Sequence, residues 1–164
     1  MIQQLWIQNY AIIEEVDIQF STQLTTITGE TGAGKSIIMG ALGLILGERA
    51  DTKVLYHKDQ KCIVEGTFHI ESYQLKSFFE QNDLDYDPEC IIRREINPSG
   101  KSRAFINDTP TRLSVLKKLS NYIIDLHGGV LSTYVEIIKA MSVIVNDITI
   151  EKTGTINSTG FQEA

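Results

Sequence analysis

Residues 29–36 read GETGAGKS and match the pattern G-x-x-x-x-G-K-[ST], in which glycines, a lysine and a hydroxyl have fixed spacing. Glycine lets successive backbone N–H groups turn inward and form a nest for an anion. Lys35 would reach the β- and γ-phosphates of a nucleotide, and the Ser36 hydroxyl would bind the Mg²⁺ that bridges them. The pattern predicts an ATP-Mg²⁺ site. Its predicted nucleotide-binding residues are Gly29, Glu30, Thr31, Gly32, Ala33, Gly34, Lys35 and Ser36.

Hydrolysis of a bound triphosphate needs groups that this motif does not supply. An acid on a neighbouring strand must hold the metal, and another group must position water. Asp125, which closes the run YIID, is one candidate, and Asp147 is a weaker one. A strand-end aspartate that faces solvent is the simpler reading of Asp125, and His127 is more often structural than catalytic in such a place. No complete catalytic set is predicted.

A phosphate-binding loop needs a strand before it and a helix after it. Residues 24–28, LTTIT, are β-branched and predict that strand. The apolar run from Ser36 predicts a buried helix that ends at Gly47. Gly40 and Gly43 weaken its helix propensity, so we expect close packing against a sheet as compensation.

The remaining sequence predicts further strands and helices of one α/β domain. Ser72 is expected to cap one of the helices. The expected elements are two strands within 5–20 that break at Gln8–Asn9, a strand at 62–70, a helix at 72–81, a hairpin of 90–96 and 102–108 around the turn 97–100, a helix from Pro110 to about Leu119, a strand at 122–127, a helix or strands at 130–145, and a frayed end from 151.

Composition argues against nucleic-acid binding through bulk positive charge, since the formal net charge is -6. The basic pairs Arg93–Arg94, Lys101–Arg103 and Lys117–Lys118 are expected to be solvated surface, although any of them offers a local patch. Cys62 and Cys90 fit neither a disulfide framework nor a zinc motif and are expected to be buried thiols. No secretory signal or membrane span is visible, which favours a cytoplasmic protein without a membrane partner.

Several blocks beyond the phosphate loop resemble one family in the order in which that family has them. These blocks are LWIQNYAIIEEVDIQF, LTTITGETGAGKSIIMGALGLILGERAD, VEGTF, IIRREINPSGKSRAFIND and IIDLHG. They are similar to the amino-terminal head lobe of the RecN family of bacterial DNA repair ATPases, which are relatives of the SMC ATPases. The resemblance implies an ABC/SMC-type P-loop NTPase lobe over residues 1–128, with a mixed sheet, early antiparallel strands and a β-hairpin.

The resemblance also implies partners and further residues. In the family a carboxy-terminal lobe supplies the signature motif, the Walker B acid and the catalytic glutamate, and two heads enclose ATP as a homodimer that acts on DNA in recombinational double-strand break repair. Arg49 matches an arginine near the nucleotide and DNA side of SMC-like heads. Lys101 and Arg103 match a hairpin that packs or contacts DNA, although neutral surface roles fit them equally.

One departure from the family concerns hydrolysis. Gly129 occupies the place of the family's Q-loop glutamine, and no heptad pattern or SGGE-like motif follows it. We therefore expect a divergent tail at 129–164 and a chain that binds ATP but does not turn it over alone. The open alternatives are a self-sufficient small P-loop kinase or NTPase that uses Asp125, and a non-hydrolysing nucleotide-binding module. Nucleoid association is compatible with the cytoplasmic expectation.

Overall fold

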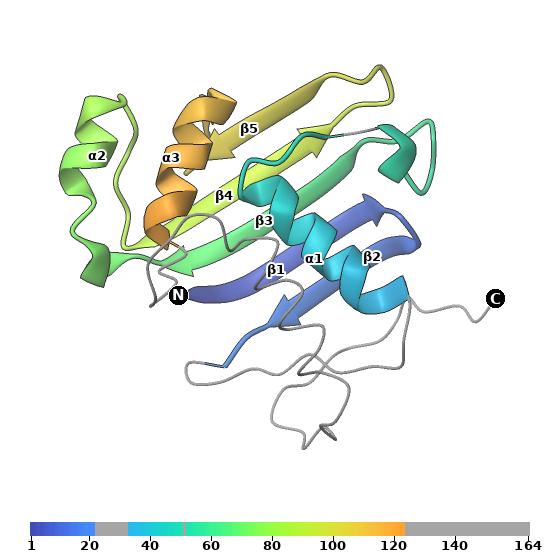
Figure 1. Ribbon diagram of the computed structural model, residues 1–164, viewed down its shortest axis with the longest axis horizontal. Helices are drawn as coiled ribbons and strands as arrows, with labels where there is room; N and C mark the ends of the chain where they lie inside the picture. Colours follow the sequence, from blue (N-terminus) through green and yellow to red (C-terminus); the bar gives the residue numbers. More distant parts are fainter. Residues whose placement is uncertain (22–32, 51, 124–164) are drawn as a thin grey trace.

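A computed structural model describes residues 1–21, 33–50 and 52–123 and shows one antiparallel sheet with helices packed on it (Figure 1). The six described strands follow the order β2-β1-β3-β4-β5-β6, and every pair is antiparallel. The strands are β1 (Ile2–Tyr10), β2 (Ile13–Gln19), β3 (Cys62–His69), β4 (Glu89–Ile96), β5 (Ser102–Ile106) and β6 (Thr109–Thr111).

The two early strands are confirmed, but the predicted break between them at Gln8–Asn9 is wrong. β1 continues to Tyr10, and Tyr10 pairs with Ile13 across a two-residue turn. Asn9 keeps its place in the strand with a left-handed backbone (φ 55°), which asparagine tolerates better than most residues. Its buried side chain is then held by the loop that contains His57.

In the described ranges three α-helices accompany the sheet: α1 (Ala33–Ile45), α2 (Lys76–Gln81) and α3 (Leu113–Ile123). In Figure 1, α1 crosses one face over β1, β3 and β4, and α3 lies on the same face over β5. Alternation along the strands sends one set of side chains to this face, as a half-buried sheet requires. The buried set includes Leu5 and Ile7 of β1, Val64 and Phe68 of β3, Ile92 and Ile96 of β4, and Ile106 of β5.

Glycines bring α1 close to the sheet. A Cβ at Gly40 would lie 2.5 Å from the Tyr10 hydroxyl oxygen, and one at Gly66 of β3 would lie 2.6 Å from Cδ1 of Ile45. The close approach expected at Gly40 is therefore present. Gly43 differs, because its nearest neighbour is the carboxylate of Glu48, which follows the helix, and not a strand.

The predicted helix at 72–81, with Ser72 as its cap, is wrong in its first half. A short 3-10 turn, η2 (Glu71–Tyr73), ends at Gln74, whose left-handed backbone (φ 54°) interrupts the helix. α2 then starts at Lys76, and no side chain caps it at Leu75. Its buried Phe79 anchors it beside the sheet, so packing rather than capping holds this segment.

The sequence predicted that a helix ends near Leu119 and that a strand begins at 122. The described residues contradict this prediction. Tyr122 and Ile123, the first residues of the expected strand 122–127, form the last turn described for α3. Leu116, Leu119 and Ile123 recur at helical spacing and are all buried, so the helical pattern extends past Leu119. The β4–β5 hairpin is confirmed, with Gly100 left-handed (φ 82°) in its turn.

The expected buried thiols are also confirmed. Cys62 and Cys90 are free and fully buried, at opposite ends of the β3–β4 pairing. Within the described ranges, none of the helices is long and apolar enough to cross a bilayer. The predicted strand 24–28 and the predictions beyond residue 123 lie outside the described residues.

Candidate functional site

The described half of the predicted phosphate loop forms the first turn of α1. Ala33, Gly34, Lys35 and Ser36 lie in this turn, and residues 29–32 lie outside the described residues. The first N–H groups of a helix lack intrahelical acceptors and carry the positive end of its dipole. Gly34 and Ser36 are exposed, and no acidic side chain occupies the turn. This helix end is therefore suited to an anion.

The space around Gly34 supports the same assignment. Among the residues that the structure describes, none has an atom within 4 Å of a Cβ placed at this position, so the described part of the chain leaves the volume beside the backbone open. The fold in turn fixes the direction of the helix, because apolar contacts hold Ala41, Leu44 and Ile45 against the sheet. An open first turn on a fixed helix fits the phosphates of a nucleotide, with the Ser36 hydroxyl available to a Mg²⁺ ion.

Helix α1 starts three residues before the predicted Ser36. The glycine-rich sequence concealed this start, because Gly34 disfavours a helix interior. In a first turn the cost is small, since the N–H groups there have no intrahelical bond to lose. The motif and the helix thus overlap at residues 33–36 and do not merely adjoin.

At its other end, α1 closes with a Schellman motif. Gly47 is left-handed (φ 96°), its N–H donates to the Leu44 carbonyl (3.1 Å), and the Glu48 N–H donates to the Gly43 carbonyl (2.9 Å). The predicted glycine stop is thereby confirmed. Arg49 follows directly and is exposed to solvent.

The basic pair Arg93–Arg94 is not the solvated surface that we expected. Consecutive strand residues point to opposite faces, so the two guanidinium groups separate. Arg94 is only 2% exposed and lies under α1, where it donates to the Leu44 carbonyl (3.2 Å), the Glu48 carbonyl (3.3 Å) and the Ser102 hydroxyl (2.5 Å). Burial lowers the pKa of its guanidinium, but the pKa of arginine is so high that the charge remains.

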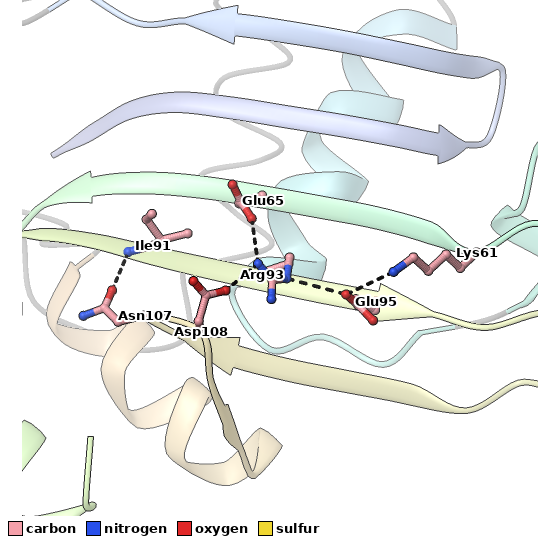
Figure 2. Close-up of polar contacts among 7 residues, drawn as sticks. All are labelled: Lys61, Glu65, Ile91, Arg93, Glu95, Asn107 and Asp108. Atoms are coloured by element: carbon pink, nitrogen blue, oxygen red, sulfur yellow. Dashed lines mark hydrogen bonds and ion pairs between the residues drawn. The ribbon is translucent and has the colours of Figure 1, made fainter. Parts of the chain in front are cut away.

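Arg93 lies on the outer face of the sheet among carboxylates, as Figure 2 shows. Its guanidinium is 2.7 Å from Asp108, 3.3 Å from Glu65 and 3.6 Å from Glu95. Burial lowers its pKa and the hydrogen bonds to Asp108 and Glu65 raise it, with a net upward shift. The guanidinium also lies 4.7 Å from the centre of the Phe105 ring. These carboxylates offset the positive charge of Arg93.

The other cationic candidates remain on the surface. Lys101 and Arg103 are exposed on the β4–β5 hairpin, and Lys117 and Lys118 are exposed on α3. Exposure agrees with a solvated role, and the side-chain stem of Lys117 also covers Gly47 at the end of α1.

Predictions for four further residues cannot be compared with the structure. Asp125, His127 and Gly129 lie outside the described residues, as does Asp147. The helical placement of Tyr122 and Ile123 nevertheless removes the start of the strand on which the metal-binding role of Asp125 depended.

Sequence reasoning missed Arg94 as a buried contact of α1. The signal was present in the strand CIIRREI, because alternation places Arg94 on the same face as Cys90, Ile92 and Ile96. Tyr10 and Asn9 were missed as well. No local signal marks them, since their partners Gly40 and His57 are 30 or more residues away in the sequence.

The strand order and the helix α1, which starts within the GETGAGKS motif, agree with the expected SMC-type head fold. The chain belongs to the AAA domain family, whose model matches residues 4–160. It is similar to DNA repair protein RecN of Vibrio cholerae, with 45% identity over 129 residues that cover 78% of this chain and 23% of the relative. RecN of Haemophilus influenzae is 42% identical over 132 residues, with 78% and 24% covered. The chain thus spans about a quarter of the length of these curated relatives.

Solved structures show the same fold. A structure described under ATP-driven dimerization and DNA-stimulated activation of SMC ATPases superposes with a TM-score of 0.60 at 21% identity, over 88% of this chain and 96% of the other. An SMC head bound to the C-terminal winged-helix domain of ScpA has a TM-score of 0.60 at 22% identity, over 78% and 42%. The resemblance noted in the sequence and the predicted α/β head fold are therefore confirmed.

Proposed function

We propose that this chain is the ATP-Mg²⁺-binding lobe of a RecN-like ATPase that acts in recombinational repair of DNA double-strand breaks. The observation that carries the proposal is the exposed first turn of α1, which presents Gly34 and Ser36 in the GETGAGKS motif of a chain similar to RecN. Residues 29–36 would hold the nucleotide and Ser36 the metal. Bound ATP-Mg²⁺ would supply the γ-phosphoryl group that such ATPases transfer to water.

The lobe is incomplete for hydrolysis by itself. The sequence shows neither a signature motif nor a paired Walker B acid, and Gly129 stands in place of the family's glutamine. A carboxy-terminal lobe and a second head would complete the site, and the ATP-driven dimerization of the SMC ATPases is a precedent. Residues 1–128 would form this lobe and 129–164 a divergent tail. We place the protein in the cytoplasm, associated with the nucleoid through DNA.

Arg49 is proposed to face the nucleotide or DNA side of the assembled head. It follows the end of α1 and is exposed, so it is accessible to a partner. Lys101 and Arg103 are accessible as well, on the hairpin. The net negative charge of the chain means that DNA contact would depend on such local groups and on the other lobe.

Calorimetry with ATP and Mg²⁺ on the purified chain tests the proposal. The parent should bind ATP, and Lys35→Ala should abolish binding without unfolding the chain, because the lysine contacts the phosphates. Turnover by the isolated chain should be negligible. Failure to bind ATP at millimolar concentration would refute the nucleotide site, and rapid hydrolysis that Asp125→Asn abolishes would favour a self-sufficient enzyme.

A further inference from the structure

Arg94 of β4 links the sheet to the carboxyl end of α1, the helix whose first turn is the candidate phosphate site. In the cross-strand row that faces α1, it lies between Val64 of β3 and Ala104 of β5. Both neighbours are buried and apolar, and Arg94 itself is 2% exposed. A charged side chain in such a row is costly unless hydrogen bonds compensate for the lost water.

The compensation comes from the end of α1. Nη1 of Arg94 donates to the carbonyls of Leu44 and Glu48, which lie on either side of the Gly47 turn. Nη2 donates to the Ser102 hydroxyl, so β5 braces the guanidinium from the other side. Arg94 therefore contacts both the last turn of α1, at Leu44, and Glu48 beyond the Gly47 turn.

The charge of Arg94 is directed at the helix. Among the residues that the structure describes, no carboxylate forms an ion pair with it, whereas Arg93 has three. The carboxyl end of a helix carries partial negative charge, which a buried cation stabilises. A planar guanidinium can bind two carbonyls and a hydroxyl together, which a lysine ammonium on a flexible stem does less well.

The opposite end of the same helix is the candidate phosphate site. α1 has 13 residues, so it is about 20 Å long. A tilt of about 5° around its carboxyl end would displace its first turn by about 1.7 Å, enough to disrupt hydrogen bonds that need a donor–acceptor distance of about 3 Å. Small changes at Arg94 are thereby amplified at Gly34 and Ser36.

We propose that Arg94 is a positioning residue for nucleotide binding. With Ser102, it fixes α1 on the sheet and so sets the place of the first-turn N–H groups, although it lies at the far end of the helix from the phosphates. This inference rests on the proposed ATP site. It makes the β4–β5 hairpin part of the mechanical support of that site.

The test compares variants of the whole 164-residue chain. Arg94→Met keeps the apolar stem and removes the donors, Arg94→Lys keeps the charge, and Ser102→Ala removes only the brace. Phe79→Leu is the matched control, because it disturbs a buried residue of α2, which lies beyond α3 and away from α1 (Figure 1). Affinity for a fluorescent ATP analogue with Mg²⁺ is measured at a temperature where circular dichroism shows every variant folded.

We expect Arg94→Met to weaken nucleotide binding at least tenfold, Arg94→Lys to restore part of the loss, and Ser102→Ala to weaken binding two- to fivefold. Phe79→Leu should stay within twofold of the parent despite its lower stability. Amide hydrogen exchange should accelerate in the first two turns of α1 in Arg94→Met and not in α2 or β3.

Parent-like affinity in Arg94→Met, or an equal loss in Phe79→Leu, would overturn the positioning role. If Arg94→Met does not fold, Arg94→Lys and Ser102→Ala decide by the same criteria. A parent that binds no ATP refutes the proposed site instead. Hydrogen exchange in Arg94→Met then tests by itself whether Arg94 fixes α1 on the sheet. Faster exchange confined to α1 supports this role, and uniformly faster exchange overturns it.

Discussion

The contact between Gly40 and Tyr10 predicts the effect of Gly40→Ala on stability. The substitution should destabilise the chain when residue 10 is Tyr and stabilise it when residue 10 is Phe. In Gly40→Ala the new Cβ would lie 2.5 Å from the Tyr10 hydroxyl oxygen but 3.6 Å from the ring carbon Cζ. The first distance requires a shift and the second is ordinary van der Waals contact. Tyr10 is only 7% exposed and belongs to a paired strand, so the ring has little room to move.

Two opposing terms set the size of the effect. Alanine in place of glycine stabilises a helix interior by about 1 kcal/mol. Overpacking a buried contact costs about 2 kcal/mol, within the usual range of about 1–3 kcal/mol. Gly40→Ala should therefore lower the free energy of unfolding by about 1 kcal/mol. In a Tyr10→Phe background the clash is removed, and the same substitution should raise it by about 1 kcal/mol.

A double-mutant cycle by urea unfolding measures this coupling, which should be about 2 kcal/mol. Trp6, the only tryptophan, reports on β1 by fluorescence, and far-ultraviolet circular dichroism reports on the helices. The reasoning is refuted if Gly40→Ala is equally destabilising with Tyr10 and with Phe at position 10. It also fails if Gly40→Ala stabilises the parent.

Three other predictions follow from the described contacts. Gly34→Ala should leave the urea midpoint unchanged, since its Cβ meets no atom of the described residues, yet weaken ATP binding in calorimetry by filling the space beside the backbone; tight binding would argue against this turn as the phosphate site. Asn9→Ala should destabilise the chain by about 2–3 kcal/mol in urea unfolding, because a buried side chain loses its bonds to the loop at His57 and alanine tolerates a positive φ poorly; a loss below about 0.5 kcal/mol contradicts it. Burial raises the pKa of Cys62 and Cys90 from 9.0 to about 12. As pH rises, the unfolded chain therefore loses these protons before the folded chain does. The stability contributed by the thiols is lost as pH rises from about 9 towards 12. By pH 10 each thiol should account for about 1 kcal/mol of that loss, and unfolding at pH 7 and pH 10 should show a smaller fall for Cys62→Ala than for the parent.

The strands and the hairpin were predictable because their signals are local. Alternation in CIVEGTFH and CIIRREI marks β3 and β4, and Gly100 marks the turn beyond β4. The segment around α2 was predicted poorly, since nothing near Gln74 indicates that it adopts a left-handed backbone. Its conformation depends on the burial of Phe79 and Leu75, which belong to a core cluster built from several strands and helices.

Short-range patterns in the sequence sufficed to predict the GETGAGKS motif, the helix behind it, the glycine that ends that helix and the family of the chain, because each depends on residue types at short and fixed spacing. The different roles of neighbouring Arg93 and Arg94 became visible in the folded chain and not in the sequence pattern. Strand geometry sends one to a cluster of carboxylates on the outer face and the other beneath the end of α1. Burial and partners arise from strand pairing over tens of residues, and short-range spacing does not encode them.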